Sequence, residues 1–297
     1  MRCFKIQSGF SLVELIIVIV IVGILATGIA TFITLPVQGF IDLSRRATLV
    51  YSAESALRRM QRDIRRALPN SIRVAGGGTA IEMINTRVGM RYRSAPPPGN
   101  PDNRLTIVGG PDTDFDVFGD LTTFIGVGGL RVSVNNTGDT LAGVPVRGLN
   151  AYALPDPVTG TNVVTSTPAV NPITITNGVF LPDEDHINIG GGGFQFTNHS
   201  LNNRVYLVDG GISYVCNGGQ LTRYSGYNFT NSVQPVPPAG LGETVALMSD
   251  NVGNCAFTYV AGTPQRSGLM TLDLTVTDAA TGESVRLLHQ VHVDNVP

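Results

Sequence analysis

The chain has 297 residues, only 14% of them charged, and it contains no tryptophan. Its formal net charge is -2, which gives no electrostatic basis for nucleic-acid binding. Glycine and proline are frequent, at 35 and 18 residues, and this composition is typical of a β-rich, loop-rich exported protein rather than a helical enzyme.

The first extended feature is an uncharged apolar segment at residues 15–35. As a helix it would measure about 31 Å, the thickness of a bilayer core. A cleaved secretory signal would have a shorter apolar region followed by small residues. Because Arg2 and Lys5 precede the segment, we expect a single span of the inner membrane with a cytoplasmic N-terminus and a periplasmic C-terminal domain.

A second helical pattern follows, after an interruption that we expect at Pro36 and Gly39. Between Leu43 and Leu68, apolar residues recur at steps of three, four or seven, which predicts one apolar helix face. The other faces carry many arginines, which we interpret as a solvated surface partly paired with acidic residues. We therefore expect an amphipathic helical extension over residues 36–70 and no nucleic-acid partner.

Beyond residue 70 the pattern changes to the period of two that is typical of strands. Apolar and polar residues alternate over 270–276 and again over 285–293, with a hairpin turn predicted at 278–282. An antiparallel sheet packed on the apolar helix face would bury both surfaces. The sequence thus predicts an α+β fold with an exported β-rich domain over residues 71–297.

The middle of this domain has clear turn signals. Residues 204–224 are predicted as three short strands joined by turns at 209–211 and 217–219, each of which contains Gly-Gly. Segments 135–172 and 182–203 are rich in Gly, Thr, Asn and Pro and are predicted as long surface loops.

Two cysteines, Cys216 and Cys255, lie in the expected exported domain, whereas Cys3 precedes the apolar segment. An even number of cysteines outside the cytosol favours a disulfide over two buried free thiols. Two cysteines are too few for a zinc site. We therefore predict a Cys216–Cys255 disulfide.

Four aspartates crowd a segment predicted as one loop: Asp112, Asp114, Asp116 and Asp120. Oxygen ligands at alternating positions suit calcium, but the segment lacks the glycine and the bidentate glutamate of an EF-hand. We keep them as calcium candidates against the alternative of a solvated acidic loop, with residues 183–186 as a second acidic stretch. No other cofactor is expected.

No catalytic set is evident in the sequence. The four histidines are scattered, and no G-x-S-x-G elbow, H-E-x-x-H pair or P-loop is present. An enzyme anchored by a single span is therefore disfavoured, and we expect a protein that is not an enzyme.

Residues 9–14 read GFSLVE and precede an apolar run that contains GILA at 23–26. This stretch resembles the class III leader of type IV pilins and pseudopilins. The resemblance implies that prepilin peptidase cleaves between Gly9 and Phe10, that Phe10 is N-methylated, and that residues 10–35 form a membrane-spanning helix that assembles with other pilins. Residues 1–9 would then be the leader.

Further along, stretches within residues 55–74 (55–60, 63–65 and 67–74) and within 204–224 (204–208 and 221–224) are similar to minor pilins of the mannose-sensitive haemagglutinin pilus. The J-type pseudopilins of type II secretion share the general layout. One difference from the family concerns the helix-kinking proline, which many pilins have at the position of Thr31 and which here is Pro36.

Glu14 is the acidic residue at the head of the apolar segment. A carboxylate costs about 2.5–3.5 kcal/mol at the centre of a bilayer and less near its edge, so such residues usually have a partner and a function. The resemblance implies pairing with the α-amino group that cleavage creates on Phe10, within one chain or between neighbouring subunits. The alternative is a hydrated carboxylate at the cytoplasmic interface.

Together these features predict a minor pilin that supports pilus biogenesis and adhesion. A J-type pseudopilin is the alternative within the same class. From a different class, the exported domain could be a glycan-binding adhesin on a membrane anchor. The long loops permit this third interpretation, although the sequence shows no cluster of aromatic and acidic residues that would support it.

Overall fold

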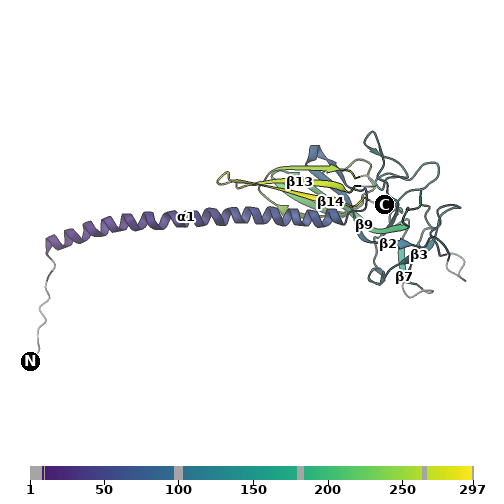
Figure 1. Ribbon diagram of the computed structural model, residues 1–297, viewed down its shortest axis with the longest axis horizontal. Coiled ribbons are helices and arrows are strands. Elements are labelled where there is room, and N and C mark those ends of the chain that lie inside the picture. The colour runs from purple at the N-terminus through teal and green to yellow at the C-terminus, as the bar shows by residue number, and fades with distance from the viewer. Residues whose placement is uncertain (1–8, 10, 97–102, 179–183, 263–265, 296–297) are drawn as a thin grey trace, which may run out of the picture. The chain divides into compact units, whose positions relative to one another are not determined.

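The chain combines one long helix with antiparallel sheets, an α+β fold (Figure 1). The computed structural model describes residues 9, 11–96, 103–178, 184–262 and 266–295. These residues form two compact units, Met1–Tyr51 and Ser52–Pro297. Helix α1 (Leu12–Arg65) begins in the first unit and ends in the second, which contains all the described strands.

The predicted interruption at Pro36 and Gly39 is wrong, because α1 continues through both residues. A proline removes one hydrogen-bond donor and crowds the carbonyl four residues earlier, but helices of the membrane-spanning kind tolerate it. The helix ends at Arg65, slightly before the predicted Leu68. There the chain turns towards the sheet, and the Leu68 N–H donates to the Ile84 carbonyl at 2.9 Å.

The last four turns of α1 have one buried face. Its members are Ala53, Ala56, Leu57, Met60 and Ile64, each at most 1% exposed. Their spacing of three or four residues is that of an amphipathic helix. The predicted apolar face is thus confirmed in this part of α1, but it does not extend back to Leu43, which is 70% exposed.

The larger sheet of the second unit has nine strands. They are β1 (Arg73–Ala75), β2 (Ala80–Tyr92), β3 (Asp114–Phe118), β4 (Arg131–Val134), β7 (Ile173–Asn177), β8 (Glu184–Ile189), β9 (Arg204–Asn217), β10 (Gln220–Tyr227) and β11 (Thr244–Ser249). The order is β11-β10-β9-β2-β3-β8-β7, with β1 paired to β2 and β4 paired to β9. Each of these pairings is antiparallel.

A second sheet contains β12 (Val252–Val260), β13 (Gly268–Thr277) and β14 (Ser284–Val293) in that order. β13 and β14 run side by side as a hairpin (Figure 1). Burial alternates strictly along β13, as its sequence predicts. The predicted turn is also present, since the Gly282 N–H donates to the Asp278 carbonyl at 2.8 Å.

The predicted turn at residues 209–211 is wrong, because β9 continues through it as one 14-residue strand. Gly210 and Gly211 instead allow neighbouring residues to pack closely against the strand. A Cβ on Gly211 would lie 2.5 Å from two ring atoms of Tyr227, and one on Gly210 would lie 3.0 Å from the backbone of Gly226. The second Gly-Gly turn, at 217–219, is where β9 and β10 form their hairpin.

Both predicted surface loops are more ordered than expected. Segment 182–203 contributes β8, whose alternating residues Ile187 and Ile189 are buried between neighbouring strands. Segment 135–172 contains the small hairpin of β5 (Thr140–Leu141) and β6 (Val144–Pro145). It also buries a group of apolar side chains, among them Tyr152 and Val163, in one cluster with Leu68, Ile84 and Phe229. The prediction from glycine and threonine content therefore assigned too many of these residues to irregular loops.

Candidate functional site

The start of α1 is defined by a cap. The Ser11 hydroxyl accepts a hydrogen bond from the Glu14 N–H at 3.2 Å, and the Ser11 carbonyl accepts one from the Leu15 N–H at 3.1 Å. A serine at this position satisfies a backbone donor that would otherwise have no partner. Glu14 thus lies in the first turn, where a carboxylate interacts favourably with the positive end of the helix dipole. Gly9 is exposed just before this cap, and Phe10 lies outside the described residues.

The first half of α1 is apolar on all sides. Leu12, Val20 and Ile24 are 75%, 54% and 67% exposed, and their neighbours are similar. A helix of this kind needs apolar surroundings over its whole circumference. Within the described part of the chain, α1 is the helix that is long and apolar enough to cross a membrane.

Comparison with known families agrees with this geometry. Residues 4–30 match the prokaryotic N-terminal methylation motif, which is that of type IV pilin-like proteins and indicates a pilin or pseudopilin. This class is structural rather than catalytic, is processed by prepilin peptidase, and assembles with other pilins. No curated protein matches the chain, and no solved structure matches it either.

A polar network connects the end of α1 to the large sheet within the second unit. The buried Asp63 carboxylate accepts hydrogen bonds from the Tyr214 hydroxyl on β9 and from Nε of Arg223 on β10, both at 2.7 Å. Burial, together with the neighbouring Asp63 carboxylate, raises the pKa of Tyr214, so this hydroxyl stays protonated as a donor. The network fixes the helix end against two adjacent strands.

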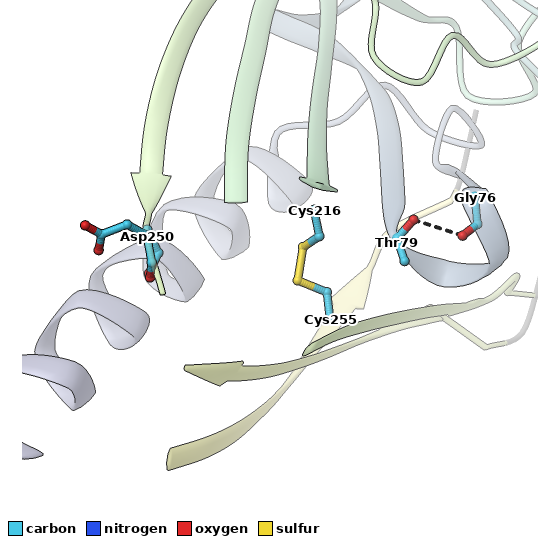
Figure 2. The surroundings of a disulfide bond; sticks show 6 residues. Gly76, Thr79, Cys216, Asp250 and Cys255 are labelled. Atoms are coloured by element: carbon cyan, nitrogen blue, oxygen red, sulfur yellow. Dashed lines mark hydrogen bonds between the residues drawn. A yellow bond between two sulfur atoms is a disulfide. The ribbon is translucent and has the colours of Figure 1, made fainter. Parts of the chain in front are cut away.

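Two cysteines of the second unit join the two sheets. Cys216, at the end of β9, forms a disulfide with Cys255 on β12, as the cysteine count predicts (Figure 2). Beside it, the Cys216 N–H donates to the Thr79 carbonyl at 2.9 Å, and the Thr79 hydroxyl donates to the Gly76 carbonyl at 2.9 Å. The Val252 N–H, which donates to the Gly219 carbonyl at 2.8 Å, is a further link between the sheets.

The four candidate calcium ligands do not occupy one loop. Asp114 and Asp116 lie on β3, and each contacts His186 of β8, at 3.2 and 2.8 Å. An Asp112 carboxylate oxygen accepts from the Thr106 N–H at 2.5 Å, and Asp120 accepts from the Thr122 N–H at 2.8 Å. Each carboxylate therefore has a local partner.

The second acidic stretch is only partly described, since Asp183 lies outside the described residues. Glu184 pairs with Arg93, and Asp185 accepts a hydrogen bond from the Leu121 N–H. Within the described ranges, no group of three or more His, Cys, Asp or Glu side chains is arranged to hold a metal ion. Calcium binding stays an untested prediction.

The histidines are as dispersed in space as in the sequence. His199 lies beside the ring of Tyr92, and His289 and His292 occupy opposite faces of β14. His186 faces the two β3 aspartates. Among the described residues, the histidines therefore do not gather in one cluster.

The burial of one charged residue was not predicted from the sequence. Arg131 on β4 is 5% exposed and lies over the ring of Phe229. Burial lowers the pKa of its guanidinium to about 10, so it still carries a full charge at neutral pH. Arg131 stands alone between apolar residues in the sequence, and the residues around it come from segments about a hundred positions away, so no local motif reveals it.

Proposed function

We propose that the chain is a minor pilin, similar to MshO of the mannose-sensitive haemagglutinin pilus, that supports pilus biogenesis and adhesion. The observation that carries this proposal is the methylation motif at residues 4–30, which overlaps the start of a capped helix with no charged residue between Leu15 and Leu35. The similarity of segments 55–74 and 204–224 to this group of minor pilins supports the finer assignment.

In this proposal, prepilin peptidase removes residues 1–9, and Phe10 is methylated at its new amino group. Residues 10–35 then hold the protein in the inner membrane until assembly. The N-terminus lies in the cytoplasm and the β-rich domain lies in the periplasm. Other pilins pack around the same helix when the subunit leaves the lipid.

Glu14 is proposed to select the stagger between neighbouring helices. After cleavage, the Phe10 amino group would be four residues before Glu14 in the sequence, and the same group of a neighbouring subunit is an equally suitable partner. An unpaired charge inside a helix bundle is costly, so pairing favours one register even where its net stabilisation is small.

The test compares three variants in cells that assemble pili. Glu14→Ala is expected to leave cleavage and membrane insertion intact while lowering incorporation into sheared pili. Gly9→Val is expected to block cleavage, because the peptidase needs a small residue before the cut. Asp42→Ala removes an exposed carboxylate from the same helix and serves as the matched control with normal incorporation.

Immunoblots of sheared pili and membranes, with peptide mapping of the N-terminus, measure all three outcomes. Normal incorporation of Glu14→Ala would refute the pairing role, and a mature protein that begins at Met1 would refute the proposal as a whole. Deleting the gene separates the two branches of the class: lost piliation supports the minor pilin, whereas lost protein secretion with normal pili identifies a J-type pseudopilin.

A further inference from the structure

The second unit has a surface pocket of about 320 Å³. Its lining includes Arg131 from β4, Asp209 from β9, and the Tyr227–Phe229 segment at the end of β10. Leu241 and Gly242, just before β11, complete it. Its volume lies at the lower end of the range for small-molecule sites.

Arg131 has only neutral partners in this pocket. Its two terminal nitrogens donate to the Thr230 hydroxyl and to the Asn228 side-chain carbonyl, both at 3.0 Å. The guanidinium carbon lies 4.6 Å from the centre of the Phe229 ring. Among the described residues, no carboxylate forms an ion pair with it. A buried charge without a counter-ion costs several kcal/mol, and an anion in the pocket would offset that cost.

Asp209 lines the same pocket but already has its own partners. One carboxylate oxygen accepts from the Asn85 amide at 2.7 Å, and the other lies 3.5 Å from an Arg87 nitrogen. Its negative charge disfavours a doubly charged phosphate beside Arg131. Its remaining acceptor capacity suits hydroxyl donors.

Part of the pocket lining carries no side chains. Gly129, Gly226 and Gly242 line it, and all three have a positive φ. A Cβ on any of them would meet nothing within 4 Å, so the space beyond each backbone is open. A hydroxyl-rich sugar ring could therefore approach this part of the lining without a clash.

We propose that this pocket binds the carboxylate of an acidic sugar, such as a uronic or sialic acid unit of a glycan. Arg131 holds the carboxylate through paired, charge-assisted hydrogen bonds. Asp209 accepts from ring hydroxyls, and the glycine rim admits the rest of the glycan. This binding activity is additional to pilus assembly and does not depend on it.

The test uses the full chain in detergent micelles and measures binding by isothermal titration calorimetry. The probes are glucuronate and N-acetylneuraminate, with glucose as the neutral counterpart of glucuronate and acetate as a bare carboxylate. At least one acid is expected to bind saturably and about tenfold or more tightly than either control. Glucose lacks the charge-assisted contact with Arg131, and acetate lacks the hydroxyls that Asp209 would accept from.

Two variants place the binding at this pocket. Arg131→Gln is expected to lower the affinity for the acidic sugar by about tenfold or more. Thr167 is a half-buried residue of the pocket wall, and Thr167→Glu adds a negative charge there while leaving Arg131 in place. This variant is expected to lower the affinity for the acidic sugar by a similar factor. Thr258→Glu makes the same change on the exposed face of β12 and should leave affinity unchanged.

The proposal is overturned if neither acid binds, or if glucose or acetate binds as tightly as the acids. Equal affinity of Thr167→Glu and Thr258→Glu for the acid would also overturn it, even if Arg131→Gln failed to fold. None of these results bears on leader cleavage or pilus incorporation, which are read from sheared pili.

Discussion

Tyr227 explains why two adjacent glycines lie inside a strand. Its ring is 1% exposed, and its hydroxyl bonds to Glu82 at 2.7 Å and to Ser213 at 2.5 Å. The ring occupies the space where residue 211 would otherwise have a side chain. From the sequence, Gly210-Gly211 after an aspartate is a good turn signal, because nothing nearby shows that a tyrosine of the next strand will pack there.

This packing gives a residue-scale prediction for the full chain. Gly211→Ala should lower the free energy of unfolding by about 1–3 kcal/mol, because the added methyl group forces the Tyr227 ring from its hydrogen-bonded position. Urea-induced unfolding followed by circular dichroism measures the loss. Gly128→Ala is the matched control, since a Cβ there meets nothing within 4 Å, and it should change stability by about 0.5 kcal/mol or less. Equal effects of the two substitutions would show that the close contact is unimportant.

At the scale of elements, periodicity predicted best where one face is buried and the other is solvated. β13 and β14 follow the predicted alternation along their whole length, and so does the last part of α1 from Leu57 onwards. The segment that contains β8 was predicted as a loop, because β8 is a short strand that begins with acidic residues. Periodicity also predicted, wrongly, that Leu43 lies on a buried face. A repeat of apolar residues indicates helix geometry, but it does not indicate how far along the helix the covering sheet extends.

The buried face of α1 leads to a prediction about fragments. A fragment that begins at Ser44 keeps the buried residues Ala53 to Ile64 and lacks the apolar span, so it should be soluble and monomeric. A fragment that begins at Asn70 loses these residues and exposes the apolar surface they cover, which favours aggregation. Size-exclusion chromatography distinguishes the two results. A folded, monomeric shorter fragment beside an insoluble longer one would contradict helix-on-sheet packing.

Point variants test the same packing without truncation. Leu57→Ala removes a fully buried side chain and should cost about 2–5 kcal/mol, depending on how far the cavity collapses. Leu43→Ala is the matched control on the same helix, and its cost should be about 0.5 kcal/mol or less, because that side chain is exposed. Because alanine favours helices at least as well as leucine, a similar loss at both positions would mean that burial against the sheet does not determine the effect.

At the scale of the whole molecule, the sequence predicted the components but not how they are joined. The membrane helix, the β-rich domain and the cysteine pair follow from local composition and counting. The strand order does not, since β9 also pairs with β2 and β4, which come from distant parts of the chain. The Arg131 pocket is likewise formed by residues from 129 to 242, whose proximity depends on that order.

The disulfide is the covalent link between the two sheets, and its removal should affect them unequally. Cys216 and Cys255 are 39 positions apart, and a loop of this length contributes about 4 kcal/mol in the chain-entropy model. The double variant Cys216→Ser, Cys255→Ser avoids a free thiol and should lose about 2–4 kcal/mol of unfolding free energy. β12, β13 and β14 should show the larger increase in hydrogen exchange, because their sheet has three strands, whereas β9 is also held by its pairings with β2, β4 and β10 in the nine-stranded sheet. A reducing agent should destabilise the wild type by a similar amount and leave the double variant unchanged. If mass spectrometry of unreduced, exported protein found two alkylatable thiols, or if reduction affected both proteins equally, this role of the cysteine pair would be wrong.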